Sequence, residues 1–263
     1  MERAQTHQQG ESRFDALVAR ARKGVSQRVT RNVSLWRRRS QLKSPLATFS
    51  FDDFPKSAWT NGGPLLARYG ARATYFVAGG LEGQTLDGLR HFDRDDLTEI
   101  AAAGHEIGCH TFDHMRIVFG AKSEVEATLK RNADFVREAA GVEMTTFAYP
   151  FGHVNLSTKY MIANRFAAAR GIWVGANAPN VDMAQVQAIP IESRSWDATD
   201  FDALIAQAQR SNGWLVFFGH DVQEKPSPFG CTPAQLESLL QRVTEAGVEI
   251  QPFKDAAARV AAA

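Results

Sequence analysis

Short apolar segments alternate with longer amphipathic segments from residue 44 onward. The short segments have the length and composition of buried strands, which we expect at 46–51, 73–77, 105–109, 145–148, 166–173, 188–192, 214–218 and 248–251. The longer segments place apolar residues on one helical face, and we expect helices at 56–69, 94–103, 122–140, 156–165, 200–211 and 233–246. Residues 174–187 show little pattern and predict a loop.

The regular succession of strand and helix determines the expected fold class. Strands that are joined by helices run parallel to one another, and the helices cover the sheet. About seven or eight such units favour a closed or nearly closed (β/α) barrel of the α/β class over an open sheet.

Composition excludes several classes of protein. The 263 residues are 44% hydrophobic and 22% charged, which is typical of a globular protein and not of a disordered or collagen-like chain. Two cysteines are too few for a disulfide scaffold. No apolar run approaches the roughly 20 residues of a spanning helix, and no secretory signal pattern is found. We therefore expect no transmembrane segment and a cytoplasmic location.

The formal net charge of +1 conceals a strongly basic N-terminal segment. Residues 1–43 contain 11 Lys and Arg against 3 Asp and Glu, whereas the rest of the chain contains 19 against 26. We expect a basic, helical arm at 1–43 and the main domain at 44–263. The arm has the charge to bind an acidic surface. It contains no nucleic-acid motif, so a helix packed on the domain is favoured and no nucleic-acid partner is expected.

Polar residues follow two of the expected strands, at the ends that form the functional face of a parallel barrel. Asp52 and Asp53 follow the first strand, and His110 and His114 follow the third. Two imidazoles four residues apart and the Asp53 carboxylate would hold a divalent ion with one coordination position open. Asp52 would then accept a proton. The alternatives are ordinary surface or hydrogen-bonded histidines, and an aspartate that caps a helix.

Two further strand ends carry candidate chemistry. His220 follows the apolar strand at 214–218 and is suited to protonating a leaving amine, or it merely caps the strand. Residues 149–152 form a rigid Tyr-Pro-Phe-Gly turn whose backbone N–H groups could face an oxyanion, although a plain turn explains the same residues. We expect His91 to be structural.

Together these residues resemble the motifs of the polysaccharide deacetylases, metal-dependent esterases that remove N-acetyl groups from chitin, peptidoglycan and related glycans. The first motif, T-F-D-D, corresponds to residues 50–53, and the second, H-[ST]-x-x-H, to residues 110–114. The third, R-x-P-[YF]-G, corresponds to residues 148–152, and the fifth, an apolar strand ending in L-x-H, to residues 216–220. The order and spacing match over roughly residues 46–250.

The resemblance implies a distorted (β/α) barrel with about seven parallel strands, and a catalytic domain at 44–263. It implies hydrolysis of the N-acetyl amide of a glycan or glycoside, with a divalent metal for which zinc is expected and cobalt, nickel or manganese are alternatives. The site residues that it implies are the metal ligands Asp53, His110 and His114, the general base Asp52, the general acid His220 and the oxyanion-binding N–H of Phe151.

The sequence departs from the family's motifs at two points. The third-motif arginine, which orients the base in the family, is Ala148 here, and Arg194 is the nearest candidate replacement. The fourth motif is matched only by residues 195–197, so that Asp197 is the candidate partner of His220. The candidates for substrate binding are Tyr149, Arg194, Trp196 and Asp197.

Two alternative functions stay open. The missing arginine would also fit a catalytically weak glycan-binding module that keeps the metal. A hydrolase that cleaves the C–N bond of a non-sugar amide is the second alternative, because barrel relatives of the family carry out such chemistry.

Overall fold

The protein is described by a computed structural model at residues 30, 33–34 and 36–262. Its main sheet consists of β2 (Leu46–Asp52), β3 (Thr74–Val77), β6 (Glu106–Cys109), β7 (Thr146–Ala148), β8 (Ala168–Arg170), β10 (Ile189–Pro190), β11 (Trp214–Gly219) and β12 (Glu249–Ile250). The hydrogen-bonded order is β10-β11-β2-β3-β6-β7-β8, with β12 also paired to β2, and every pairing is parallel. The expected parallel fold is therefore confirmed.

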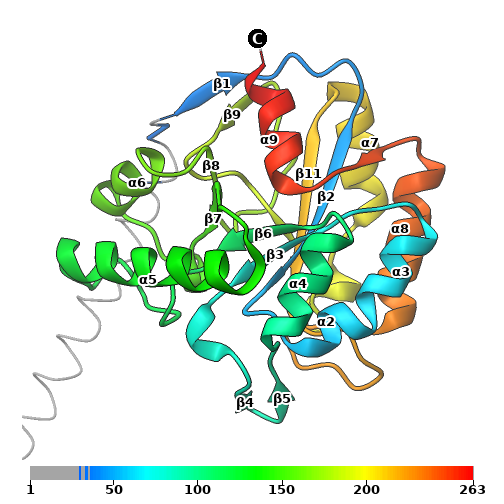
Figure 1. Cartoon of the computed structure of the whole chain (residues 1–263). Coiled ribbons are helices and arrows are strands. Elements are labelled where there is room, and N and C mark those ends of the chain that lie inside the picture. The colour runs from blue at the N-terminus through cyan, green and yellow to red at the C-terminus, as the bar shows by residue number, and fades with distance from the viewer. Residues whose placement is uncertain (1–29, 31–32, 35, 263) are drawn as a thin grey trace, which may run out of the picture.

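Helices cover the curled sheet, and Figure 1 shows α2, α3, α7 and α8 grouped beside β2 and β11, with α5 and α6 beside β7 and β8. The helices are α2 (Lys56–Thr60), α3 (Gly62–Arg68), α4 (Arg94–Ala102), α5 (Lys122–Ala140), α6 (Leu156–Ala163), α7 (Phe201–Ser211), α8 (Pro233–Glu245) and α9 (Phe253–Ala261). Single 3-10 turns lie at Gly79–Leu81, Pro150–Gly152 and Trp196–Ala198. Within the described residues, no helix combines the length and the apolar character needed to cross a bilayer.

Both faces of the strands are buried. Alternate side chains of a strand point to opposite sides of the sheet, so they enter two different cores. In β11, Phe217 belongs to the core beneath the covering helices, whereas Val216 and Phe218 belong to a separate core on the inner face. Phe253 and Val260 of α9 pack into this inner core. The concave side of the sheet is therefore filled by side chains and by the C-terminal helix.

Three features differ from the expected pattern. The two edge strands, β8 and β10, do not pair with each other, so the sheet is a curled half-barrel, which is consistent with the expected distorted (β/α) barrel but is not closed. The helix expected at 56–69 is divided into α2 and α3 at Asn61. The short hairpin of β4 (Thr85–Leu86) and β5 (Leu89–Arg90) and the helix α9 were not expected from the pattern.

The end of the N-terminal arm is built into the domain. β1 (Arg37–Arg39) pairs antiparallel with β9 (Asn180–Asp182), which lies within the segment expected to be a loop. This part of the arm is a strand rather than the expected helix, and its three arginines are exposed. The helix expected for residues 1–29 lies outside the described residues.

A buried lysine fastens the same segment. Lys159 of α6 is fully buried and donates hydrogen bonds to the carbonyl oxygens of Thr30, at 3.0 Å, and Val33, at 2.7 Å. It also forms a 2.5 Å ion pair with Asp182 of β9. Because a buried ammonium must be fully paired, Lys159 ties the arm, α6 and β9 to one another.

Candidate active site

The carboxyl ends of β2, β6, β7 and β11 open into one cleft. Its volume is about 960 Å³, and it is lined by Asp52, Asp53, Pro55, Leu81, Leu86, Asp87, Gly88, Leu89, His91, His110, His114, Tyr149, Phe151, Gly152, Ile172, Glu192, Arg194, Phe218, His220, Gln223, Lys225, Pro226, Ser227, Pro228 and Phe229. The β4–β5 hairpin, which contributes to the rim, projects at the end of the molecule opposite β1 and α9 (Figure 1). The strand-end residues that the sequence singled out thus share one cleft.

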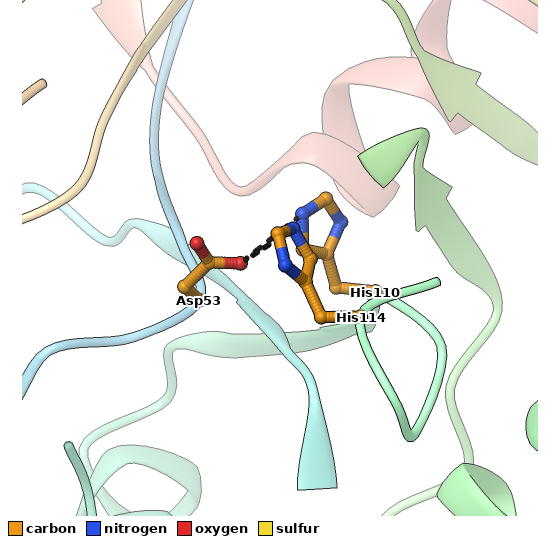
Figure 2. Close-up of side chains that lie close together, drawn as sticks. All are labelled: Asp53, His110 and His114. Carbon is orange, nitrogen blue, oxygen red and sulfur yellow. Dashed lines mark ion pairs between the residues drawn. The ribbon is translucent and has the colours of Figure 1, made fainter. Parts of the chain in front are cut away.

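Asp53, His110 and His114 form a compact cluster at the floor of this cleft. Asp53 follows β2, and the two histidines come from the loop that follows β6. The Asp53 Oδ1 atom lies 3.4 Å from His110 Nε2 and 3.1 Å from His114 Nε2. Figure 2 shows both imidazole rings directed at the Asp53 carboxylate. One ligand atom from each residue lies within 4.8 Å of the other two, so the cluster is a candidate site for a divalent metal.

The protonation of this cluster fits a cation. His110 Nδ1 lies 2.9 Å from the Ala148 carbonyl oxygen, which can only accept, so that Nδ1 carries the proton and Nε2 of the neutral ring presents a lone pair. Burial is the main cause that lowers the pKa of His114 to about 4. Asp53 Oδ1 is buried and has no hydrogen-bond donor among the described residues. Lone pairs that face one another in this way repel unless a cation lies between them.

The backbone around the cluster adopts conformations that cost free energy. Among the described residues, seven that are not glycine have a positive φ. Five of them lie on the segments that form the floor of the cleft: Asp53, Phe54, Thr111, His114 and Phe151. Each such residue costs on the order of 1–3 kcal/mol, and such residues concentrate at active sites and ligand sites. The fold therefore holds these segments in place at a cost to its stability.

Asp52 lies beside the cluster and is held by a buried arginine. The residue is 5% exposed, and its Oδ2 accepts a hydrogen bond from an Nη atom of Arg170, which is completely buried. Burial raises the pKa of the Asp52 carboxyl, but the charges of Arg170, His110 and His220 and the Arg170 hydrogen bond outweigh it and hold the pKa below its usual value. Asp52 Oδ1 has no partner among the described residues. Asp52 is thus ionised, with one oxygen available to take a proton.

Arg170 occupies the place that Arg194 was expected to fill. Arg170 ends β8, and its register partner on β7 is Ala148, the position at which the third motif lacks its arginine. Ala168 and Ala148 belong to the inner core, so Arg170, two residues after Ala168, points to the same side. The guanidinium lies over the Phe218 ring at 4.6 Å. The arginine therefore comes from the neighbouring strand, and Arg194 does not contact Asp52.

Replacing Arg170 should impair the expected base, Asp52, rather than the candidate metal ligands Asp53, His110 and His114. We expect Arg170→Met to lower kcat/KM about 10²-fold, because a displaced catalytic group costs about that factor. With the Arg170 cation gone and burial unchanged, the pKa of Asp52 rises, so the acidic limb of the pH–rate profile moves to higher pH. The measurement is kcat/KM against pH, together with metal content.

A relocation variant supplies the control for this prediction. Ala148→Arg combined with Arg170→Ala places the cation on the register partner, as the motif has it. We expect this double variant to recover part of the lost rate and to restore the position of the acidic limb. Wild-type activity and an unshifted profile in Arg170→Met would contradict the assigned role.

His220 lies beside the cluster. Its Nε2 atom lies 3.8 Å from Asp53 Oδ2, and its Nδ1 lies 3.3 Å from the carbonyl oxygen of Phe229. The carbonyl accepts from Nδ1, which leaves Nε2 directed at the site. The loop that carries Phe229 is fixed by the fully buried Asp221, whose carboxylate accepts hydrogen bonds from the backbone N–H of Ser227 at 2.9 Å and its hydroxyl at 2.5 Å.

The remaining sequence candidates divide into two groups. Tyr149 and Arg194 line the cleft, although the Tyr149 hydroxyl is used by the Ala184 carbonyl, 2.9 Å away. Asp197 is exposed and does not line the cleft, and the ring of Trp196 packs on Phe201 at 4.7 Å. The expected pairing of Asp197 with His220 is wrong, because a backbone carbonyl takes the place of that carboxylate.

Phe151, the expected oxyanion-binding residue, lies next to the candidate metal cluster. Both it and Gly152 have a positive φ, which turns the chain sharply at the end of β7. The Phe151 ring lies 4.4 Å from that of the metal-ligand candidate His114. The role of its backbone N–H stays a prediction.

Sequence reasoning missed two residues of the cleft wall. His91, expected to be structural, lines the cleft with a 5% exposed side chain, and its Nδ1 has no hydrogen-bond partner among the described residues. Glu192, also buried, pairs with Arg194. His91 follows β5, a strand too short for the sequence pattern to reveal, whereas Glu192 stands at the end of the strand expected at 188–192, and that position was the available signal.

Comparison with known proteins agrees with this geometry. A family model described as polysaccharide deacetylase matches residues 39–168, which contain Asp52, Asp53, His110 and His114. A curated protein of Listeria monocytogenes, the peptidoglycan-N-acetylglucosamine deacetylase PgdA, is 31% identical over 107 residues. That match covers 40% of this chain but only 21% of the Listeria protein.

Solved structures show the same fold. A family 4 acetyl xylan esterase from Clostridium thermocellum, in complex with a cobalt ion, is similar with a TM-score of 0.56 at 19% identity, covering 80% of this chain and 89% of that one. The Bc1960 peptidoglycan N-acetylglucosamine deacetylase has a TM-score of 0.57 at 14% identity, covering 82% and 90%. The family-model match over residues 39–168, the curated relatives and the shared fold together support the assignment of this chain to the polysaccharide deacetylase family.

Proposed function

We propose that this protein is a metal-dependent N-deacetylase that hydrolyses the N-acetyl amide of a sugar or glycan. One observation carries the proposal. One potential metal-ligand atom from each of Asp53, His110 and His114 lies close to the other two, and His110 Nε2 faces Asp53 Oδ1 with a lone pair rather than a proton. The ionised Asp52 lies beside them in an open cleft. Such a cluster next to a base is the arrangement that amide hydrolysis requires.

Asp53, His110 and His114 would hold the ion. Two neutral imidazole nitrogens and one carboxylate oxygen are a donor set that suits zinc and leaves a position open, and cobalt, nickel and manganese accept the same donors. When bound, the ion would polarise the acyl carbonyl and lower the pKa of a water molecule toward ~7. The cobalt ion in the related acetyl xylan esterase supports a divalent metal at this fold's site.

The chain's own residues supply the proton transfers. Asp52 takes the proton of the attacking water through its free Oδ1, while Arg170 keeps the carboxyl ionised and fixed. The backbone N–H of Phe151 donates to the oxyanion. His220 gives a proton from Nε2 to the nitrogen as the C–N bond breaks, so that acetate and a free amine leave.

The substrate class follows from the relatives and the cleft. The Listeria relative is named for peptidoglycan N-acetylglucosamine, and the 960 Å³ cleft is large enough for more than one sugar ring. The missing third-motif arginine was the reason to consider a glycan-binding module, and Arg170 removes that reason. We therefore favour an enzyme acting on an N-acetylated glycan or glycoside.

Acetate release tests this proposal. Zinc-loaded protein should release acetate from N-acetylated oligosaccharides or peptidoglycan fragments, and far more slowly from N-acetylated amino acids. Release from the amino acids alone would favour the non-sugar amide hydrolase. Binding of the glycans without acetate release, with each of the four metals, would contradict the enzyme and support a binding module.

A further inference from the structure

One wall of the cleft carries two cations that the proposed reaction does not use. Arg194 and Lys225 both line the cleft, on segments that follow β10 and β11. The segments are joined by the Ser193 N–H and hydroxyl, which donate to the Gly230 carbonyl oxygen at 2.7 and 2.8 Å. The two cations are therefore presented by one connected wall.

The Arg194 guanidinium is held in a fixed plane. Its Nε donates to Glu192 Oε2 at 2.6 Å, and the Glu192 side chain is only 4% exposed. The guanidinium carbon lies 4.2 Å from the centre of the Phe229 ring, so the plane stacks on an aromatic face. Phe229 is itself placed by the loop whose carbonyl orients His220. This arginine is thus pre-organised rather than mobile.

The fixed guanidinium has donors left over. Glu192 uses Nε, and within the described part of the chain the terminal Nη atoms of Arg194 and the Nζ of Lys225 contact no carboxylate. The Arg194 side chain is 53% exposed. The Arg194 guanidinium offers a planar pair of N–H donors, and Lys225 adds a second cation in the same wall. Together they suit the two oxygens of a carboxylate or phosphate. A neutral sugar needs neither charge.

The hairpin part of the cleft lining has the contrary charge. Asp87, at the turn of the β4–β5 hairpin, also lines the cleft and would repel an anion. An anionic substrate would therefore be oriented with its charge toward Arg194 and Lys225.

We infer that Arg194 and Lys225 bind an anionic group, a carboxylate or a phosphate, that the N-acetylated substrate carries in addition to its acetamido group. This inference rests on the proposed function and narrows its substrate class to acidic sugars. Arg194 is a specificity-determining residue in this account and takes no part in the proton transfers.

Three probes that share the N-acetylated sugar and differ in the anionic group attached to it test the inference. They are N-acetylglucosamine, N-acetylmuramic acid, which adds a carboxylate, and N-acetylglucosamine 6-phosphate. For the zinc-loaded wild type we expect the KM, or the Kd by calorimetry, to be at least about tenfold lower for one anionic probe than for the neutral one. Comparing the two anionic probes identifies the source of the oxyanion.

The Arg194→Gln variant should remove most of this preference. We expect its ratio of anionic to neutral KM to rise about tenfold, with kcat for the anionic probe changed less than its KM, and Arg194→Lys to recover part of the ratio. Arg94→Gln is the matched control, because Arg94 also pairs with carboxylates and stacks on a phenylalanine but does not line the cleft.

The outcomes separate this inference from the proposed function. Equal affinity of the wild type for all three probes, or a preference that Arg194→Gln leaves intact, would overturn the anionic subsite. An equal loss of kcat on all probes in Arg194→Gln would show that Arg194 only supports the wall. If no probe or glycan releases acetate, the proposed deacetylase fails, and calorimetry still decides whether the anion binds through Arg194.

Discussion

Asp52→Asn is expected to lower kcat by about 10²-fold or more while the protein keeps its fold and its metal. The amide cannot take a proton from the attacking water, and it leaves the Asp53, His110 and His114 ligand atoms untouched. The substitution is nearly isosteric, so the contact with the buried Arg170 can persist through the amide oxygen. Initial rates of acetate release, with metal content and thermal unfolding, provide the measurement.

The control for this variant is Asp197→Asn. Asp197 is exposed and does not line the cleft, so we expect its replacement to leave the rate within about twofold of wild type, as for most surface changes. An Asp52→Asn protein that binds metal and retains near wild-type kcat would show that another group takes the proton. Loss of metal in this variant would instead assign Asp52 to the ligand set.

His114→Ala is expected to abolish both metal retention and acetate release. The substitution leaves two of the three donors, and the open cleft lets the ion exchange with solvent. Even loss of a group that merely supports a ligand costs roughly 10–100-fold in affinity or activity, so loss of a ligand itself should cost more. The ratio of metal to protein after dialysis and the rate of acetate release are the two measurements.

His153→Ala is the matched control for the metal measurement. His153 follows the Pro150–Gly152 turn and is not a member of the ligand cluster, so its variant should retain the ion. A His114→Ala protein that is free of metal and still releases acetate would contradict metal dependence. Retention of a full equivalent of metal would show that His114 is not a ligand.

The sequence predicts the floor of the cleft because strand ends are local features. The apolar run before Asp52 and Asp53, and the one before His110, fix where each strand stops. In a parallel sheet those ends must lie at the same edge, so residues far apart in the chain come together. The spacing of His110 and His114 then brings both rings to one point, as the structure shows.

Arg170 could not be assigned in the same way. Its role depends on the register between β7 and β8, which sets Ala148 beside it, and on the curl of the sheet that brings β8 toward β2. The local sequence pattern predicts neither the register nor the curl of the sheet. A single arginine in an otherwise apolar strand was the available signal, because a charge is buried only when it is paired.

The other elements that the sequence did not predict also depend on short or non-local features. The β4–β5 hairpin has strands of two residues, too short for any periodicity to register. α9 is rich in alanine and resembles a low-complexity tail, yet Phe253 and Val260 fill the inner core. β1 consists of three arginines, which adopt a strand conformation only because they pair with β9. The cytoplasmic location stays a prediction.

Titration of metal-stripped protein with zinc tests the central claim most directly. Acetate release from an N-acetylated glycan is followed as zinc is added, with His114→Ala in parallel. We expect no release without metal, a linear rise that saturates at one ion per chain, and no rise in the variant. Full release before any zinc is added, or one bound ion with no release from any N-acetylated glycan, would contradict it.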